Sequence, residues 1–337
     1  MTGKEVSIAF QTDKTAGEYI ALAQLVDQFS FDVVSVYCDA PFHPSYGPLI
    51  LMAPHITKAR IGPAAVSPFR MHPIDIAANT ALLAGLARGG VYVGLARGAW
   101  LTDHGIKEPS SPICGIREAI EIIRNLLSGG SGGIEGKVFN IHKNVRSPYP
   151  LPKDQIPVLV GTWGEKLARV AGERADEVKI GGSSNPLMVN RLQPQISMGE
   201  SSAGREPGKV KIIMGAVTVV DKDRDLARKI ARRKAALYLP VVAPLDPTIQ
   251  VDPGLLGKLQ SFVNSGDYNQ AGDLISDHLL DRFAFSGNPD DIIEQTHKLF
   301  DAGVSRVEFG TPHGIDSKSG IDLIGRIVLP ELRKSYN

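Results

Sequence analysis

A short glycine-containing stretch, GTWGEK (161–166), combines residue types that suit anion binding. It follows an apolar run and opens a helical pattern, so its backbone N–H groups can receive an anion at a helix N-terminus. These groups belong to Gly161, Thr162, Trp163 and Gly164. A simple cap at the end of the strand explains the same residues equally well. The stretch predicts either a phosphate-binding turn or an ordinary strand-to-helix connection.

Residues 62–73, GPAAVSPFRMHP, place three prolines between another apolar run and a helical pattern. Gly62, Ala64 and Ala65 are small enough for a ligand to approach the backbone, and the prolines restrict how the chain leaves the strand. The alternative is that the prolines only end the strand while the alanines pack under a helix. Position alone leaves both readings open.

Two arginines and three histidines are further candidates. Arg70 and Arg97 each follow an apolar run and suit a phosphate or carboxylate of a cofactor, with a surface salt bridge as the alternative. The glycines around Arg97 (GLARGAW) do not form a G-x-G-x-x-G pattern, so a dinucleotide-binding fold is disfavoured. The histidines lack metal-ligand spacing, and we interpret them as structural or solvated; they are His72, His104 and His278. We expect no metal site.

These candidates must be positioned by strands, and eight short runs rich in β-branched residues alternate with longer helical patterns. Several runs are almost entirely apolar, as in a parallel sheet whose two faces are covered by helices. They are residues 6–10, 33–37, 59–66, 91–96, 157–161, 177–182, 211–220 and 305–310. Eight alternations within 337 residues favour an α/β fold of the (β/α)8 TIM-barrel type over an open doubly wound sheet.

The segment 73–90 illustrates the helical patterns. Apolar or small residues recur at helical spacing, Pro73 suits the first turn and two glycines suit the end; the recurring residues are Ile74, Ala78, Ala81, Leu82 and Gly85. The spacing predicts a helix whose apolar face contains these residues.

Two segments interrupt the alternation. Residues 128–155 are rich in glycine and proline and predict a small hairpin, whereas residues 237–285 are too long for a simple loop and predict extra helices over one end of the barrel. No internal repeat or linker is evident. We therefore expect residues 1–337 to form a single domain with insertions at about 128–155 and 237–285.

Composition excludes several classes of protein. The 37 basic and 36 acidic residues leave a net charge of +1 without a basic run, so nucleic acid is not an expected partner. Two cysteines, Cys38 and Cys114, form neither a disulfide framework nor a zinc pattern, which fits a reducing cytoplasm. No stretch has the apolar length of a signal peptide or a membrane span. The expected ligand is a small molecule.

Three long segments resemble a known family. Residues 61–73, 161–186 and 265–314 are similar to the coenzyme F420-dependent methylenetetrahydromethanopterin reductases, within the bacterial luciferase-like superfamily. The resemblance runs nearly end to end. It implies a (β/α)8 barrel, a homodimer or larger assembly, and a non-prolyl cis peptide after the third strand that supports the back of the deazaflavin ring. The matching pair in this sequence is Ala64–Ala65.

The resemblance also implies where the cofactor lies. Asp39 matches an acidic residue that the family places beside the deazaflavin, although an exposed loop carboxylate is the alternative. Ala64, Ala65 and Val66 would back the ring, and Gly161 to Gly164 would contact the phosphate side chain. Arg97 and the small-residue rim Gly181–Gly182 are the remaining cofactor-binding candidates.

The sequence departs from the family at three positions that carry polar side chains in the reductases. Ala40 replaces the histidine that usually follows the strand-two aspartate, Ala9 replaces a glutamate in the first strand and Ala99 replaces an aspartate after the fourth. The nearest imidazole to Asp39 is then His43. We take Asp39 and His43 as the catalytic candidates and expect a rebuilt substrate pocket.

The sequence thus predicts a cytoplasmic F420-dependent oxidoreductase that transfers hydride to a C=N or C=C bond of a methylene-pterin-type substrate. An FMN-dependent luciferase-like monooxygenase is the first alternative. A non-catalytic flavin- or deazaflavin-binding protein is the second, because of the three alanines.

Overall fold

The eight expected strands are present in the computed structural model, which describes residues 3–336. They are β1 (Glu5–Phe10), β2 (Val33–Val36), β3 (Arg60–Pro63), β4 (Val93–Leu95), β7 (Val158–Gly161), β8 (Glu177–Gly181), β9 (Lys211–Val220) and β11 (Arg306–Gly314). The fold is a (β/α)8 TIM barrel, as predicted. Most bounds shift by one or two residues, and the two largest differences are that β3 already ends at Pro63 and that β11 continues to Gly314 past a bulge between Gly310 and His313.

The chain divides into two compact units. The central unit contains Ala9–Val178 and Gln195–Val210, and the C-terminal unit contains the residues up to Ile8, Lys179–Pro194 and the residues from Lys211 onward. The strands β1 and β8 each contribute residues to both units.

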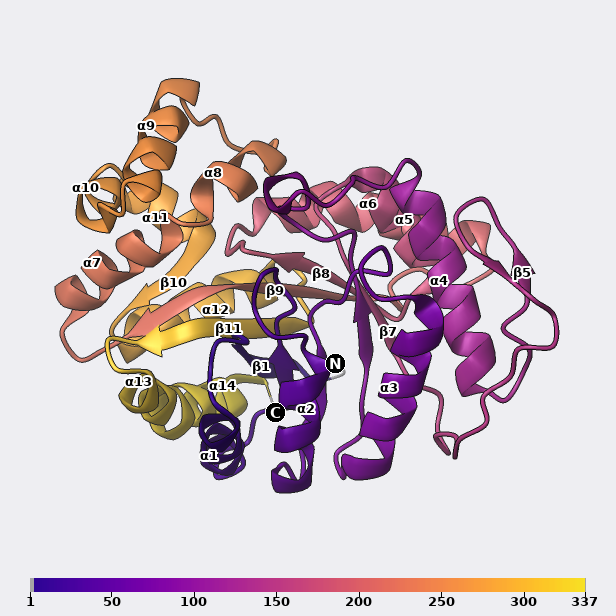
Figure 1. Ribbon diagram of the computed structural model, residues 1–337. Coiled ribbons are helices and arrows are strands. Elements are labelled where there is room, and N and C mark those ends of the chain that lie inside the picture. Colours follow the sequence, from indigo (N-terminus) through magenta and orange to yellow (C-terminus); the bar gives the residue numbers. More distant parts are fainter. Residues whose placement is uncertain (1–2, 337) are drawn as a thin grey trace. The chain divides into compact units, whose positions relative to one another are not determined.

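In the central unit, neighbouring parallel strands follow the order β2-β3-β4-β7. Val33 pairs with Arg60, Val93 pairs with Val158, and the bridges Ile61 to Val91 and Val66 to Leu95 join β3 to β4. The helices of this unit are α1 (Ala16–Val26), α2 (Tyr46–Met52), α3 (Pro73–Leu86), α4 (Pro112–Leu127) and α5 (Glu165–Arg174), while α6 (Leu187–Ser202) has residues in both units. Helices α3, α4 and α5 follow one another along the side of β7 (Figure 1).

The predicted apolar face of α3 is wrong. Leu82 is 55% exposed and Ile74 is half-buried, and of the residues named from spacing only Ala81 is buried. The helix instead buries Ile76, Ala77, Thr80, Ala81 and Leu83. The buried Tyr46 of α2 explains the rotation, because its hydroxyl bonds to the Thr80 hydroxyl at 2.7 Å and turns that side inward.

The predicted hairpin in residues 128–155 is confirmed as β5 (Ile134–Glu135) paired antiparallel with β6 (Asn140–Ile141). Its connecting turn is bound to α4, beside which it lies in Figure 1. The buried Glu118 carboxylate accepts backbone N–H groups from Lys137, Val138 and Phe139 at 2.7, 3.0 and 2.8 Å. The Glu118 side chain therefore contributes three hydrogen bonds that hold this short hairpin against α4.

In the C-terminal unit, β9 lies between β8 and β11. A short additional strand, β10 (Ala284–Gly287), pairs in parallel with the end of β9 and was not expected from the sequence. The remaining helices here are α7 (Arg224–Ala235), α12 (Pro289–Asp301), α13 (Ser317–Leu323) and α14 (Leu329–Tyr336). The long insertion forms helices as predicted, namely α8 (Leu239–Val242), α9 (Pro253–Asn264), α10 (Tyr268–Asp273) and α11 (Asp277–Phe283), gathered beside β10 in Figure 1.

Ion pairs join the first residues of several strands. In the central unit, Arg60 begins β3 and its guanidinium lies 2.5 Å from the carboxylate of Glu177, which begins β8. In the C-terminal unit, Glu5 of β1 receives both Arg306 of β11 at 3.3 Å and Lys211 of β9 at 2.5 Å. The amino-terminal ends of the strands are thus linked by charge across positions far apart in the sequence.

Within residues 3–336, none of the helices combines the length and the apolar character that crossing a membrane requires.

Candidate active site

The loop after β2 holds Asp39 against the end of β1. Asp39 is half-buried, and its Oδ2 accepts a hydrogen bond from Nε2 of Gln11 at 3.1 Å. Gln11 is itself buried and its Oε1 accepts the N–H of Thr12 at 2.9 Å, which fixes the amide so that the NH2 faces the carboxylate. Gln11 is a site residue that the sequence analysis missed, although its position directly after an apolar run was a usable signal.

His43 is attached to the same β1 loop by its backbone. The peptide Ala40–Pro41 is cis, Phe42 donates its N–H to the Asp39 carbonyl at 3.1 Å, and His43 donates its N–H to the Thr12 carbonyl at 3.0 Å. The His43 side chain is exposed. Asp39 and His43 therefore share one anchored turn, and the imidazole remains accessible to solvent.

The corner after β3 has the backbone that the resemblance implied. The Ala64–Ala65 peptide is cis, and the corner is held by the N–H of Ala64 on the Val36 carbonyl at 2.8 Å and the N–H of Val66 on the Gly94 carbonyl at 2.9 Å. Ala64 and Ala65 are half-buried, whereas Val66 is fully buried.

Glycine at position 94 is required for this close approach of β3 and β4. A Cβ atom at Gly94 would lie 2.2 Å from the Pro63 carbonyl oxygen and 3.4 Å from the Ala65 Cβ. The corner is thus built from backbone and methyl groups and presents no long side chain.

Arg97 lies beyond the end of β4 and points to solvent. Its carbonyl accepts the Ser67 hydroxyl at 2.6 Å, which joins the β3 and β4 loops, while its guanidinium is 53% exposed and 3.6 Å from Glu108. The alternative of a surface ion pair is therefore what the side chain forms here. Ala99 is half-buried in the same loop.

The turn after β7 leads into α5 without a side-chain cap. Gly164 is the N-cap residue, and its own N–H is bonded to the Thr162 hydroxyl at 3.0 Å. A Cβ atom at Gly164 would have only that hydroxyl oxygen nearby, at 3.8 Å, so the space beside the turn is open. The first-turn N–H groups of a ten-residue helix with no side-chain cap give this end a partial positive charge.

Strand pairing brings these loops together in the central unit. Val36 is opposite Pro63, Val66 is bridged to Leu95, and Leu95 is opposite Val160. Asp39, Ala64–Ala65, Arg97 and Gly161–Gly164 consequently follow the ends of four successive neighbouring strands. Trp163 and His43 lie in the same loops.

Gly181 and Gly182 belong to the C-terminal unit. Gly182 has a φ of +79° and donates its N–H to the Gly215 carbonyl at 2.6 Å. A Cβ atom there would lie 3.2 Å from Cγ1 of Val242 in the insertion, so the loop after β8 needs glycine both for its conformation and for its packing.

The three histidines that we interpreted as structural or solvated each have a nearby partner. His72 is the N-cap of α3 and its Nδ1 accepts the Ile74 N–H at 3.3 Å, and His104 Nδ1 lies 2.6 Å from the Trp100 carbonyl oxygen. His278 Nε2 lies 3.5 Å from the Arg282 guanidinium on the same helix. No group of three or more potential metal ligands occurs among residues 3–336. Arg70 is exposed and donates a hydrogen bond to the Cys38 carbonyl at 3.4 Å.

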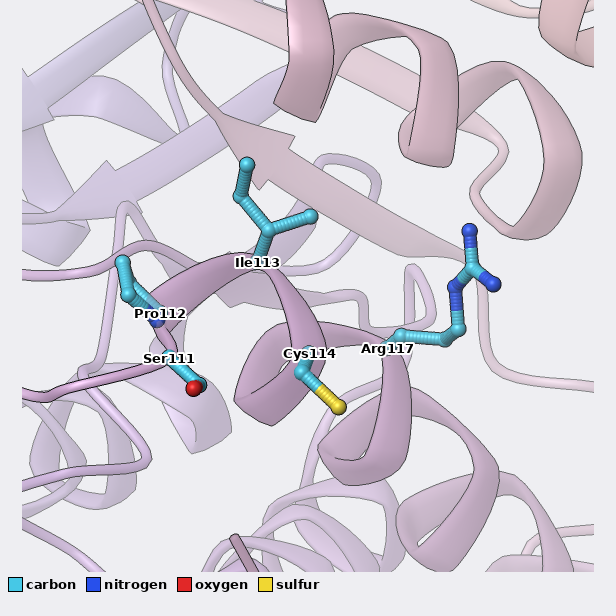
Figure 2. A pocket seen from close by; sticks show the side chains of 5 residues that line it. All are labelled: Ser111, Pro112, Ile113, Cys114 and Arg117. Atoms are coloured by element: carbon cyan, nitrogen blue, oxygen red, sulfur yellow. The ribbon is translucent and has the colours of Figure 1, made fainter. Parts of the chain in front are cut away.

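An open hollow lies at the first turn of α4, where Figure 2 shows Ser111, Pro112, Ile113, Cys114 and Arg117. The Cys114 thiol donates to Glu118 Oε1 at 3.1 Å. This hydrogen bond and burial raise the pKa of Cys114 above its ordinary value. The thiol is thus kept protonated, and its hydrogen bond goes to the same Glu118 carboxylate that binds the hairpin turn.

The geometry in the central unit offers three capabilities side by side. A carboxylate oriented by Gln11 can orient a polar group, the Ala64–Ala65 corner can back a flat ring, and the α5 turn can receive an anion. Together these suit a planar cofactor that carries a phosphate.

Known proteins resemble this chain along most of its length. The Luciferase-like monooxygenase family model matches residues 3–306. The 5,10-methylenetetrahydromethanopterin reductase of Archaeoglobus fulgidus is 29% identical, covering 97% of this chain and 99% of that protein, and the reductase of Methanopyrus kandleri is 28% identical, covering 88% and 90%. An F420-dependent glucose-6-phosphate dehydrogenase of Microbacterium testaceum is 27% identical, covering 82% of this chain and 79% of the relative.

Solved structures show the same fold. The F420-dependent tetrahydromethanopterin reductase from Methanopyrus kandleri superposes with a TM-score of 0.89 at 24% identity, covering 98% of this chain and 100% of that one. An F420-dependent secondary alcohol dehydrogenase, solved with an F420–acetone adduct, superposes with a TM-score of 0.77 at 19% identity, covering 98% and 100%.

Proposed function

Because the chain belongs to the luciferase-like monooxygenase family, we propose that it is a coenzyme F420-dependent oxidoreductase. Its reaction is hydride transfer to a C=N or C=C bond of a small molecule similar to methylenetetrahydromethanopterin. The observation that carries the proposal is the row of strand ends in the central unit, where an oriented carboxylate, a methyl-lined corner and an uncapped helix start follow successive strands.

The residues present fit a phosphate-bearing deazaflavin. The space beside Gly164 is open, and the first-turn N–H groups of α5 can bind a phosphate. Ala64 and Ala65 keep part of their surface exposed and have no long side chain to occupy the place of a ring. When bound in reduced form, the deazaflavin supplies the hydride.

The chain's own polar residues would orient the reactants and supply the proton. Asp39, held by Gln11, would accept a hydrogen bond from the bound ring. His43, accessible and tethered to Thr12, would deliver the proton that balances hydride addition to a C=N bond. Ala9, Ala40 and Ala99 supply no polar group, so the substrate is expected to differ from that of the reductases.

Two alternatives have specific support. The description of the family as monooxygenases favours FMN as the cofactor, and the alanines at 9, 40 and 99 favour a protein that binds the cofactor without turnover.

Fluorescence titration with F420 and absorbance titration with FMN test the cofactor. We expect saturable binding of F420 and none of FMN; the reverse result would replace the proposal with the monooxygenase reading. Oxidation of reduced F420 is then measured with different hydride acceptors. These are methylenetetrahydromethanopterin, a ketone whose reduction gives a secondary alcohol, and a panel of cyclic imines and enones.

Because one positioned acid–base group is worth about 10²–10⁴-fold in rate, we expect turnover of methylenetetrahydromethanopterin to be slow by that factor relative to the reductases. Rapid turnover would mean that the three alanines do not matter, and no turnover with the whole panel would favour the binding protein.

The same proposal includes a cytoplasmic location and a homodimer. Cys38 and Cys114 are both free thiols, which suits a reducing compartment. Light scattering tests the assembly, and a molar mass equal to the 36.2 kDa of one chain would contradict the dimer.

A further inference from the structure

The loop after β4 holds a tryptophan in an unfavourable backbone conformation. Trp100 has a φ of +54°, and His313 is the only other non-glycine residue with a positive φ among residues 3–336. Bulky residues rarely adopt this left-handed conformation, because the Cβ atom crowds the backbone. Residues held in this way occur mainly at ligand-binding and catalytic sites, where the surrounding structure enforces the strain. Trp100 is therefore a candidate for a role in ligand binding.

The loop itself imposes the conformation. Gly98 and Gly105 lie on either side of Trp100 and have φ values of +99° and +69°. The Trp100 carbonyl oxygen accepts the N–H of His104 at 3.2 Å and also lies 2.6 Å from the Nδ1 atom of its imidazole. Glycine at position 100 would meet the same backbone requirement without strain. The indole side chain, rather than the turn, is thus what needs a functional explanation.

This loop lies between the two places at which the cofactor is proposed to bind. On one side, Ala96 donates its N–H to the Val66 carbonyl at 3.0 Å, next to the Ala64–Ala65 corner. On the other side, a Cβ atom at Gly161, where the turn before α5 begins, would lie 3.3 Å from the Ala96 Cβ. All of these residues belong to the central unit. Side chains of the loop therefore begin between the corner that would back the ring and the turn that would bind the phosphate.

Contacts nearer to Trp100 join it to the same corner. A Cβ atom at Gly98 would lie 3.3 Å from the Ser67 Cβ, and the Ser67 hydroxyl donates to the Arg97 carbonyl at 2.6 Å. The Arg97 guanidinium is turned to solvent, whereas Ala99 and Trp100 are both half-buried. The part of the loop beside the corner thus offers a methyl group and an indole.

We propose that Trp100 determines substrate specificity, its indole packing against an aromatic ring that the substrate carries next to the reducible C=N or C=C bond. The inference rests on the proposed function and names the class of substrate, an aryl-substituted imine or enone. An indole provides a large flat surface, and aromatic pairs are more stable than the area they bury accounts for. Ala99, at a position where the resemblance implies an aspartate, adds a methyl group to the same apolar surface.

The chain contains two tryptophans, which makes the contact directly measurable by fluorescence. Trp163→Phe leaves Trp100 as the only indole, and Trp100→Phe leaves Trp163 as the matched control. The probe is benzylideneacetone, an enone with a phenyl ring, and absorption of light by the probe is the same for both proteins. We expect saturable quenching in Trp163→Phe and much weaker quenching in Trp100→Phe. Equal quenching in the two proteins, or none in Trp163→Phe, would overturn the inference.

Kinetics with reduced F420 test the specificity. The second probe is the analogue of benzylideneacetone with a cyclohexyl ring, which has a similar size but is neither flat nor aromatic. We expect the KM of the phenyl enone to be about fivefold lower than that of the cyclohexyl enone in the wild type. Trp100→Phe should keep most of this difference because it retains a ring, and Trp100→Leu should abolish it. A merely structural role would change both KM values alike, and an unchanged ratio in Trp100→Leu would contradict the proposal.

A comparison of two variants without a ring tests the strain. Asparagine adopts the left-handed conformation more readily than leucine, so Trp100→Asn should melt about 2 °C above Trp100→Leu. An equal or lower melting temperature would remove the strain on which the inference rests. Trp100→Asn also replaces Trp100→Leu in the kinetic test if the leucine variant does not fold.

The possible failures are distinguishable. If the wild-type protein binds no F420, the proposed function fails and the assignment of a substrate class fails with it. If it binds F420 but the quenching of Trp100 is absent or is matched by that of Trp163, only the inference is overturned. The fluorescence titrations contain no cofactor, so they decide the matter even where neither enone is reduced.

Discussion

The two ends of the parallel strands carry different kinds of residue. At the amino-terminal ends, several strands begin with a charged residue in an ion pair, as Arg60 does with Glu177 in one unit and Arg306 with Glu5 in the other. At the carboxyl-terminal ends the chain uses alanine and glycine, as in Ala64–Ala65, Gly161 and Gly181. In (β/α)8 barrels the first end contributes to stability and the second contains the active site. The difference shows which residues should affect unfolding and which should affect ligand binding.

Strand β8 shows this change from paired charges to small residues along one of its faces. Glu177, Lys179 and Gly181 are spaced by two, so their side chains share a face. The first joins a structural ion pair, the second joins the Glu308 pair, and the third leaves space. We therefore expect substitutions of Glu177 to change the stability alone and substitutions of Gly181 to change ligand binding alone.

The largest expected effect is at the amino-terminal ends. Glu5→Gln removes the carboxylate shared by the fully buried Arg306 and by Lys211, and should lower the free energy of unfolding by about 3 kcal/mol with no change in F420 affinity. Urea denaturation and a fluorescence titration measure the two quantities. Lys211→Met is the matched control, because this half-exposed partner should cost less than about 1 kcal/mol. A loss of affinity in Glu5→Gln at full stability would break the comparison.

The next effect is at the carboxyl-terminal end of β2. Asp39→Asn keeps an oxygen for the Gln11 amide but removes the charge, and should weaken F420 binding about tenfold, the value of one charge-assisted hydrogen bond. The melting temperature should stay within about 2 °C of the wild type, since the side chain is half-buried and its shape is preserved. Gln11→Ala should produce a smaller loss by freeing the carboxylate to rotate. Unchanged affinity in both variants would remove Asp39 from the site.

A smaller effect is expected at the turn before α5. Thr162→Val removes the hydroxyl that accepts the Gly164 N–H, and should weaken F420 binding about fivefold through a less ordered phosphate turn. Binding of the deazaflavin riboside, which has no phosphate, should not change. Equal losses for both ligands would show that the turn does not contact the phosphate.

The smallest effect concerns Cys114 and Glu118 in the helix that follows β4. Because the hydrogen bond to Glu118 and burial raise the pKa of Cys114, iodoacetamide should alkylate it slowly at pH 7.5, and Glu118→Gln should speed the reaction about threefold. Mass spectrometry of the labelled peptide measures the rate. Equal rates would show that the contact does not control the thiol.

The same carboxylate predicts an acid transition. Burial raises the pKa of Glu118, but the hydrogen bonds from Phe139, Cys114, Val138 and Lys137 outweigh it, so the pKa is lowered in the folded protein. Its stabilisation is therefore present above the unfolded-state pKa and is lost as the pH falls through the lowered folded-state value. Glu118→Gln should remove this part of the pH dependence of unfolding. A carboxylate with a structural role thus exists away from the strand starts, which limits the comparison.

The periodicity of apolar residues predicted the strands and helices whose formation depends mainly on residues close in sequence. The apolar β-branched runs became the eight strands, and the two lapses in the alternation became a hairpin and a set of helices. The corner at Ala64–Ala65 followed from the resemblance and is cis in the structure. The two compact units leave the expectation of a single domain as a prediction.

Residues whose role depends on a distant neighbour were missed. The buried face of α3 is set by Tyr46 of another helix, which spacing within 73–90 cannot reveal. Gln11 matters only because the loop with Asp39 returns to it. Lys179 and Glu308 are 129 positions apart, and nothing near either one in the sequence indicates the other.

The glycine at 215 limits how the neighbouring strands β9 and β11 can change in evolution. A Cβ atom there would lie 2.9 Å from the Glu308 Cβ and 3.0 Å from the Glu308 carbonyl oxygen. Since these two atoms remain when the side chain at 308 is shortened to alanine, such a change would not make room for a side chain at 215. A lineage can therefore vary position 308 while 215 remains glycine, whereas any side chain at 215 requires the backbones of β9 and β11 to move apart.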